Sequence, residues 1–240
     1  MEFLKIAVLN NSGNVGKSTI CNHFLHPRIP DADVIRIETI NHDGDDGTKI
    51  SSKDMTSVIE KVDLLDLAII DIGSSNIENF IKGMKENSGT HEDIDIYLLP
   101  VTPDTKQQKD TCNTVDELVD MGVEPSSIFI LLNRVDTSIS LESQFSLLVE
   151  TEILKLTATS SLAKCCVIPN TEIFTLIDQI GTTYHDAVHD ETNYRDEIRA
   201  TKDRELRSIL SLKKSCHRLA LRFDEVLNTE FSKLKKHFNH

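Results

Sequence analysis

Short apolar segments alternate with longer amphipathic ones along most of the chain, and this alternation constrains the fold more than any other feature. The apolar runs predict strands at 4–9, 34–38, 67–72, 94–101, 127–133 and 165–169. Apolar residues at helical spacing predict helices at about 17–26, 54–62, 75–87, 104–121, 141–154 and 172–187. Strands and helices that alternate in this way form a mostly parallel sheet flanked by helices, so the sequence predicts an α/β fold.

The last fifth of the chain has a different texture. Residues 195–238 contain no glycine and no proline, and apolar residues recur at helical spacing between charged ones. This pattern predicts a C-terminal amphipathic extension of one long or two shorter helices. Its apolar stripe either packs on the α/β body or serves as a dimer or partner helix. We therefore expect one domain at 1–188 and a helical extension at 189–240.

Charge is distributed unevenly between these two parts. The chain carries a net charge of −13. Residues 195–240 hold 12 lysines and arginines against 7 acidic residues, a net charge of +5, while the other 194 residues carry −18. The acidic body argues against nonspecific coating of DNA by the whole surface. The basic tail remains a candidate contact for something acidic, whether DNA, lipid or protein.

Composition excludes several classes of protein. No run of 18 apolar residues occurs and the N-terminus lacks the features of a secretory leader, so no membrane span is expected. The five cysteines are scattered, without CxxC or metal-ligand spacing, which is typical of a reducing compartment. We expect a cytoplasmic protein.

The segment between the first strand and the first helix has the composition of a phosphate-binding loop. It reads Asn11-Ser12-Gly13-Asn14-Val15-Gly16-Lys17-Ser18-Thr19. Glycines allow the backbone N–H groups to curl around a phosphate at a helix N-terminus, where the helix dipole favours an anion. Lys17 supplies a cation to the β- and γ-oxygens, and Ser18 supplies a hydroxyl to Mg²⁺. All nine residues are candidate nucleotide ligands.

A buried strand that ends in an acid supports this interpretation. Leu67-Ala-Ile-Ile-Asp71 places a carboxylate at the carboxyl end of a predicted strand. Such an acid holds a Mg²⁺-bound water in phosphate-loop proteins, so Ser18 and Asp71 are the candidate metal residues. Lys17 and Asp71 are the first two candidate catalytic residues.

A third strand ends in Asn133-Arg134-Val135-Asp136. Here Asn133 is a candidate hydrogen-bond partner for a purine, and Arg134 is a candidate to stack on it. The four residues also resemble the guanine-reading pattern Asn-Lys-x-Asp, in which Asp136 would accept from guanine. The alternative is a helix cap or turn built on Asn and Asp.

Taken together, these motifs resemble the ParA/MinD branch of P-loop ATPases. Ser12–Thr19 is similar to the deviant Walker A form of that branch, and Ala68–Asp71, Leu99–Pro103, Leu131–Arg134 and Val167–Pro169 match its later motifs. Within the branch, Ser12–Ser18, Glu38–Asn41 and Asp71–Asn76 are most like the StbB plasmid stability proteins.

The resemblance implies a nucleotide-dependent switch in plasmid stability, positioning or conjugation. It implies ATP and Mg²⁺ as cofactors, a homodimer, and an adaptor protein that binds plasmid DNA; direct contact of this chain with DNA stays open. Two departures predict slow hydrolysis. Ser12 stands where relatives carry the signature lysine, and Ile40 where they carry the water-positioning Asp, for which Asp43 is the candidate substitute and third catalytic residue.

Two alternatives remain at this stage. A GTP-binding assembly factor is favoured by the pattern that ends in Asp136. A P-loop small-molecule kinase or synthetase shares the same fold.

Overall fold

The computed structural model describes residues 3–38, 49–51, 55–87 and 89–238. It contains a seven-stranded sheet in the order β3-β2-β4-β1-β5-β6-β7, and every pair of neighbouring strands is parallel. The strands are β1 (Leu4–Val8), β2 (Asp33–Glu38), β3 (Lys49–Ser51), β4 (Leu67–Ile72), β5 (Ile96–Val101), β6 (Ile128–Val135) and β7 (Cys166–Pro169). The predicted α/β fold is confirmed.

Ten α-helices are found in the described residues: α1 (Lys17–Thr19), α2 (Met55–Asp63), α3 (Ile77–Glu86), α4 (Thr105–Asp120), α5 (Leu141–Gln144), α6 (Ser146–Glu150), α7 (Ile173–Ile180), α8 (Tyr184–Val188), α9 (Tyr194–Ala200) and α10 (Arg204–Leu234). Shorter helical segments are η1 (Ile20–Leu25), η2 (His26–Arg28), η3 (Ser74–Asn76), η4 (Thr90–Asp93), η5 (Pro125–Ser127), η6 (Ile153–Leu156), η7 (Leu162–Lys164) and η8 (Lys235–His237). The first helix continues from α1 through η1 and η2 without a break.

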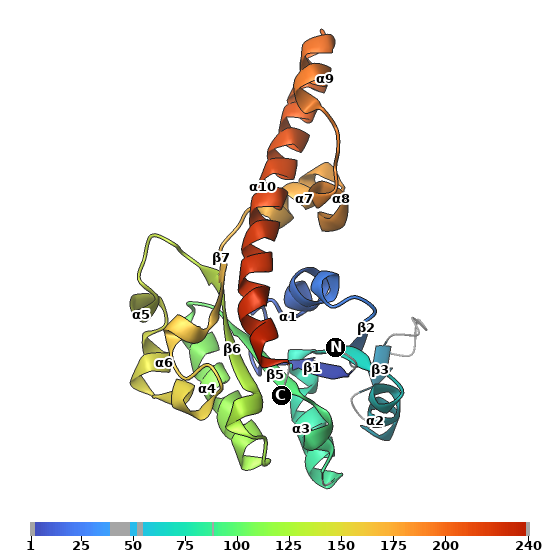
Figure 1. The fold of residues 1–240 in the computed structure, drawn as a ribbon. Helices are drawn as coiled ribbons and strands as arrows, with labels where there is room; N and C mark the ends of the chain where they lie inside the picture. Colours follow the sequence, from blue (N-terminus) through green and yellow to red (C-terminus); the bar gives the residue numbers. More distant parts are fainter. Residues whose placement is uncertain (1–2, 39–48, 52–54, 88, 239–240) are drawn as a thin grey trace. The chain divides into compact units, whose positions relative to one another are not determined.

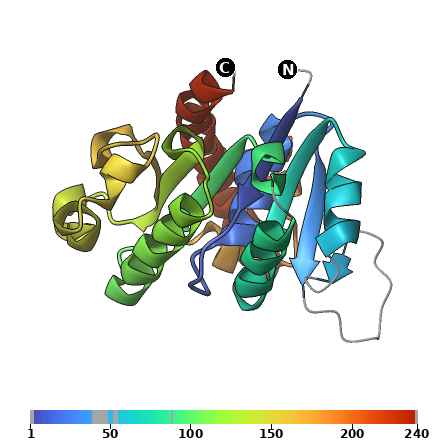
Figure 2. The same ribbon diagram turned by 90° about the horizontal axis from the view of Figure 1, so that it is seen from below.

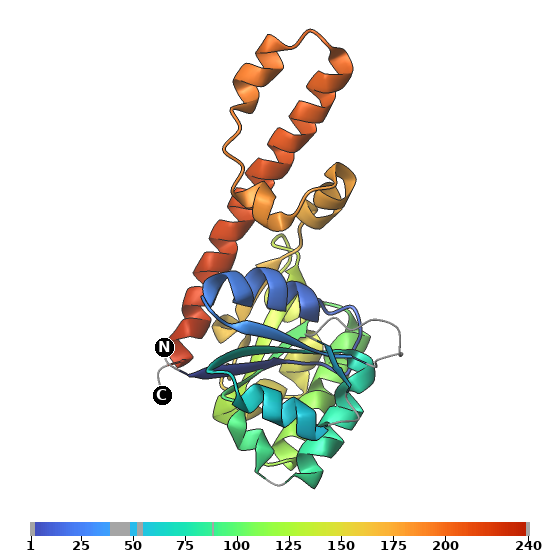
Figure 3. The ribbon, with the colours of Figure 1, turned by 90° about the vertical axis from the view of Figure 1, so that its right-hand side faces the viewer.

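Helices cover both faces of the sheet. In Figures 2 and 3, α2, α3 and α4 lie on one face, and the blue helix formed by α1 and η1 lies on the other. The strands are buried on both faces, which is why β5 shows six consecutive buried residues instead of an alternating pattern. On the face of α3 and α4, Phe80 and Val115 pack with Ile70 and Leu99 of the sheet in one apolar cluster.

The predicted strands agree with the structure within two residues at each end, and β3 is the one strand that sequence analysis did not predict. Its three residues lie beyond the polar stretch 41–48 and are too few to show a period. The C-terminal extension contains the short helix α9 and the 31-residue helix α10, so the expectation of one long helix is confirmed. No helix in the described ranges is long and apolar enough to cross a bilayer.

The chain divides into two compact units (Figure 1). Unit 1 comprises residues 1–169 and 231–240, and unit 2 comprises residues 170–230. Sequence texture placed the domain boundary at 188, whereas compactness places it after Pro169. The reason is that residues 170–188 pack with α10.

Aromatic side chains form the centre of unit 2. The ring of Phe223 on α10 makes edge contacts with Phe174 on α7 and Tyr184 on α8, with centroids 6.1 and 6.3 Å apart. The Tyr184 hydroxyl also donates to Asp224 at 3.3 Å. The amphipathic stripe of α10 therefore packs, within this unit, against α7 and α8.

Candidate functional site

The candidate residues that can be located in unit 1 gather at one edge of the sheet. The loop of Asn11–Gly16 follows the carboxyl end of β1, Asp71 stands near the carboxyl end of β4, and Asn133 near that of β6. β1 and β4 are neighbours in register, with Val8 level with Asp71. Because carboxyl ends of parallel strands meet at one edge, three separate segments contribute to a single region.

Lys17, the first residue of α1, points back into the loop that precedes it. Its side chain is 8% exposed, and Nζ donates to the backbone oxygens of Asn10 at 2.9 Å and Ser12 at 2.8 Å. The ammonium group thus lies inside the curl of the loop. A cation in this position is suited to the oxygens of a polyphosphate.

Burial changes the electrostatics of this lysine. Desolvation lowers the pKa of Lys17 from 10.5 to about 8, although the nearby carboxylate of Asp71 acts in the opposite direction. Asp71 is itself 5% exposed. The pKa of Cys21, one turn into the helix, is raised by burial and by Asp71. A buried cation near a buried acid, with pKa values shifted by burial and charge, marks a candidate functional site.

The loop conformation depends on a contact between Gly16 and Asn133. Gly16 has φ of 91°, a left-handed conformation that disfavours other residues, and a Cβ there would lie 2.5 Å from Asn133 Nδ2. The same amide nitrogen donates to the Val15 carbonyl at 2.9 Å, and Asn133 Oδ1 accepts from the backbone N–H of Arg134 at 2.9 Å. In this structure the Asn133 side chain therefore holds the phosphate loop to β6. Its predicted contact with a base stays a prediction.

Helix α4 anchors the beginning of the loop. Asn10 is fully buried, and its Nδ2 donates to Thr111 Oγ1 at 2.7 Å and to the Pro100 carbonyl at 3.0 Å. Asn10 Oδ1 accepts from the backbone N–H of Ser12 at 2.8 Å. The side chain of Asn10 therefore connects the loop to both α4 and β5.

The next residue of the loop is tied to the same helix. The backbone N–H of Asn11 donates to Thr114 Oγ1 at 3.2 Å, and Asn11 Nδ2 donates to Glu117 Oε2 at 3.2 Å. Gln107, at the start of α4, donates from Nε2 to the Gly13 carbonyl at 3.4 Å. One face of α4 thus follows the first half of the loop.

The turn after β4 borders the loop as well. Asn76 is 2% exposed, and its Nδ2 donates to the Ile37 carbonyl at 3.3 Å; the N–H of Gly73 donates to that same carbonyl at 3.2 Å. A Cβ at Gly13 would lie 3.6 Å from Ser74 Oγ. The segment 73–76 therefore connects the end of β2 with the tip of the phosphate loop.

Asp136 is part of a turn. Its Oδ1 accepts from the backbone N–H of Ser138 at 2.9 Å and from the Ser138 hydroxyl at 2.6 Å, and these bonds lower the pKa of Asp136. Arg134 is exposed and has φ of 54°. This geometry is that of the turn that was the alternative interpretation of the motif. Binding of a base by Arg134 and Asp136 stays a prediction.

Two residues of the catalytic hypothesis, Asp43 and Ile40, lie outside the described residues. The remaining donor set fits a magnesium ion, because Ser18 offers an exposed hydroxyl at the start of the helix and Asp71 a carboxylate near the buried Lys17. Mg²⁺ bound there would supply charge to neutralise phosphate oxygens.

Sequence reasoning missed the residues that position the loop. They share burial and hydrogen bonds to the loop or to the turn beside it, and they are Asn10, Asn76, Thr111, Thr114 and Asn133 in its role toward Val15. For the two threonines of α4, the sequence did contain a signal that they have a structural role. Thr111 and Thr114 are polar residues on the face that buries Val115 and Leu118, and buried hydroxyls require partners.

No protein-family model matches the chain, and no curated protein matches its sequence. Solved structures with similar folds include the MinD cell division protein of Aquifex aeolicus, at 15% identity and a TM-score of 0.49, covering 88% of this chain and 96% of that one. A Cyanothece McdA–ATP complex matches at 14% identity and a TM-score of 0.46, covering 90% and 96%. MinD of Pyrococcus horikoshii with Mg-ADP matches at 12% identity and a TM-score of 0.48, covering 91% and 97%. TM-scores below one half assign no function to this chain.

Proposed function

We propose that this protein binds a nucleoside triphosphate with Mg²⁺ at the loop of residues 11–19 and works as a nucleotide-dependent switch. The observation that carries the proposal is the buried ammonium of Lys17, which lies within the curl of the loop and bonds to the backbone oxygens of Asn10 and Ser12. Burial of the Lys17 ammonium costs desolvation free energy, and the negative charge of a bound phosphate would offset that cost.

ATP is the proposed nucleotide. The carboxylate of Asp136, which a guanine would need as an acceptor, already accepts two hydrogen bonds from Ser138. Both amide atoms of Asn133 are engaged by main-chain groups. Recognition of guanine by Asn133 would require its main-chain bonds to be exchanged, whereas Asp136 keeps Oδ2 available because Ser138 uses only Oδ1. GTP is therefore the alternative to be titrated beside ATP.

Slow Mg-dependent hydrolysis belongs to the same proposal. Ser12 is 5% exposed, its N–H donates to Asn10 and its carbonyl accepts from Lys17. Ser12 is buried within its own chain, and its side chain carries no positive charge that could reach another subunit. We infer that nucleotide state mainly controls association, with a homodimer and an adaptor protein in plasmid stability or conjugation as the proposed context. That context rests on the motif resemblance.

The test is the substitution Lys17→Ala. Loss of a charged contact to phosphate is expected to cost about 2–4 kcal/mol, or on the order of 30- to 1,000-fold in affinity. Isothermal titration of ATP and GTP in the presence of Mg²⁺ measures it. The matched control is Lys106→Ala, an exposed lysine on α4. Equal affinities of the parent and Lys17→Ala proteins would contradict the proposal.

A further inference from the structure

A cavity lies at the edge of the sheet opposite the phosphate loop. It has a volume of about 760 Å³ and is lined by residues at the amino-terminal ends of β1, β5 and β6, together with the C-terminal turn of unit 1. The phosphate loop follows the carboxyl end of β1, and none of its residues lines this cavity. The volume falls in the usual range of small-molecule pockets, roughly 300–1,000 Å³.

Aromatic rings from separate segments form much of its wall. Phe3 precedes β1, Phe129 belongs to β6, and His237 and Phe238 come from the C-terminal turn. The rings of Phe129 and His237 are in edge contact, with centroids 5.0 Å apart. Phe3 is 69% exposed, a large apolar side chain at the border of the cavity. Ring faces attract both apolar groups and cations.

The wall of the cavity carries three carboxylates and two histidines, His91 and His237. Glu92, Asp95 and Glu124 line the cavity, and none of the described residues that line it is a lysine or an arginine. Within the described ranges, the carboxylates of Glu92 and Glu124 form no hydrogen bond and no ion pair. These two carboxylates therefore have no bonded cationic partner among the described residues of the wall.

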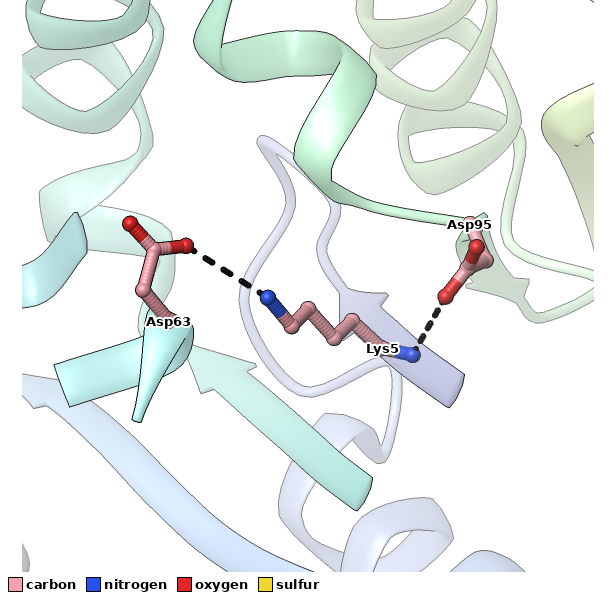
Figure 4. Close-up of polar contacts among 3 residues, drawn as sticks. All are labelled: Lys5, Asp63 and Asp95. Carbon is pink, nitrogen blue, oxygen red and sulfur yellow. Dashed lines mark hydrogen bonds and ion pairs between the residues drawn. The ribbon is translucent and has the colours of Figure 1, made fainter. Parts of the chain in front are cut away.

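The nearest lysine on β1 is directed away from it. In Figure 4 the side chain of Lys5 extends toward Asp63, with Nζ 3.4 Å from Oδ1, while only its backbone N–H reaches Asp95 Oδ2, at 2.7 Å. The N–H of Asp95 in turn donates to the Lys5 carbonyl at 3.0 Å. Asp95 is thus fixed by main-chain bonds, and it forms no ion pair with the described residues.

The wall between η4 and β5 is braced. Tyr97 is fully buried in the core, and its hydroxyl donates to the His91 carbonyl at 2.9 Å. A Cβ at Gly122 would lie 3.3 Å from His91 Nε2, so a glycine at this position lets the two loops approach closely. The backbone of η4, which carries Glu92, is therefore held to β5 and lies close to the loop at Gly122.

We propose that this cavity binds an organic cation, an ammonium or guanidinium group on an apolar stem. The rings of Phe129 and Phe238 would enclose the stem, and Glu92 and Glu124 would pair with the charge. The ligand is either a free amine or the side chain of a lysine or arginine in a partner protein, since both present the same chemistry. Nothing in this site depends on the nucleotide-binding loop.

The first experiment titrates the ¹⁵N-labelled full-length chain with phenethylammonium and follows the amide signals of Gly122, Ser127 and Ala158. Saturable shifts are expected at these signals. The anion 3-phenylpropanoate, which has a similar size and shape, is expected to leave them unchanged. An absence of saturable shifts, or equal shifts with the anion, would overturn the proposal.

Variants then test the residues. The double substitution Glu92→Gln with Glu124→Gln is expected to weaken binding of phenethylammonium about fivefold or more. Its matched control is Glu142→Gln with Glu150→Gln, two exposed acids that do not line the cavity. Equal weakening in both pairs would show a general charge effect and would contradict the site. Phe129→Leu keeps the apolar volume, removes a ring, and is also expected to weaken binding.

Two further arms separate the possibilities. Lys17→Ala is expected to bind phenethylammonium as the parent does, so a failure of the nucleotide proposal leaves this test intact. An acetylated Leu-Arg-Phe amide is compared with agmatine, the free guanidinium amine. Tighter binding of the peptide supports a partner side chain, and equal binding supports a free amine. If the same peptide with citrulline in place of arginine binds equally well, the cation is not what the cavity recognises.

Discussion

At the scale of single residues, three side chains hold the phosphate loop in its conformation. Lys17 is buried and bonded to loop carbonyls, Asn10 connects the loop to α4, and Asn133 connects it to β6. The sequence identified Lys17 through its position after Gly16. It named Asn133 only as a candidate partner for a purine and did not identify Asn10, because the groups to which these two side chains donate lie about one hundred residues away in the chain.

The lowered pKa of Lys17 predicts how nucleotide binding depends on pH. Unfolded, this lysine titrates at 10.5; folded, at about 8. The folded state therefore loses its proton first, so its stability rises with pH across the window from about 8 to 10.5, as the cost of burying the charge is relieved. Binding of a polyphosphate requires the charged form. ATP affinity should fall about tenfold between pH 7 and pH 9.

Isothermal titration at the two pH values measures this effect. The control is Lys17→Ala, whose weaker affinity should be nearly constant over the same range. An equal decline in the variant would assign the pH dependence to another group.

The contact between Gly16 and Asn133 gives a second prediction. Gly16→Ala should lower the free energy of unfolding by about 1–3 kcal/mol. The alanine would have to adopt a positive φ, and its Cβ would clash with Asn133 Nδ2. Adding Asn133→Ala should recover part of that loss. Gly89→Ala is the matched control: its φ of 95° is similar, but no atom lies within 4 Å of the added Cβ.

Urea unfolding of the single and double variants gives the coupling energy between the two positions. Strictly additive losses, or a cost for Gly89→Ala equal to that for Gly16→Ala, would mean that the contact does not matter.

At the scale of elements, α4 is the helix on which the loop depends. One face of this helix bonds to the start and tip of the loop: Gln107 bonds to Gly13, Thr111 to Asn10, and both Thr114 and Glu117 to Asn11. Asn11, in place of the usual first glycine, is held by two of these bonds. The amphipathic period of the segment 104–121 was enough to predict the helix. Its period could not show that the two threonines face a loop nearly one hundred residues earlier.

We expect Thr111→Val to loosen this anchor. Thr111 is fully buried, accepts from Asn10 Nδ2 and donates to the Gln107 carbonyl. A methyl group of similar size leaves the Asn10 amide with one partner fewer, at a cost of about 1–3 kcal/mol. Thermal or urea unfolding should show that loss, and titration should show weaker ATP binding.

Thr105→Val, at an exposed position in the first turn of α4, is the control and should change neither quantity. If Thr111→Val retains full stability and full affinity, the anchor has no energetic importance.

At the scale of the whole molecule, the chain combines an α/β unit with a helical unit. The acidic body and the basic C-terminal segment were evident from the sequence. Compactness assigns residues 170–188 to the helical unit, because the rings of Phe174 and Tyr184 pack on Phe223. Such long-range packing has no local signature.

Nucleotide-dependent dimerisation is the prediction that belongs to this scale. The sedimentation coefficient should rise from that of a monomer to that of a dimer when a nonhydrolysable ATP analogue and Mg²⁺ are added. Lys17→Ala should remain a monomer at the same concentrations. A parent protein that binds the analogue without changing its association state would exclude the switch and favour a monomeric P-loop enzyme.

The sequence by itself determined the order of strands and helices, the parallel sheet, and the loop that carries Lys17. It could do so because these features depend on local period and on residues adjacent in the chain. The tertiary structure alone decided which carbonyl each asparagine reaches, where the units divide, and how aromatic rings and carboxylates meet at the opposite edge of the sheet. Those contacts join residues far apart in the chain, and only packing brings them within hydrogen-bond distance.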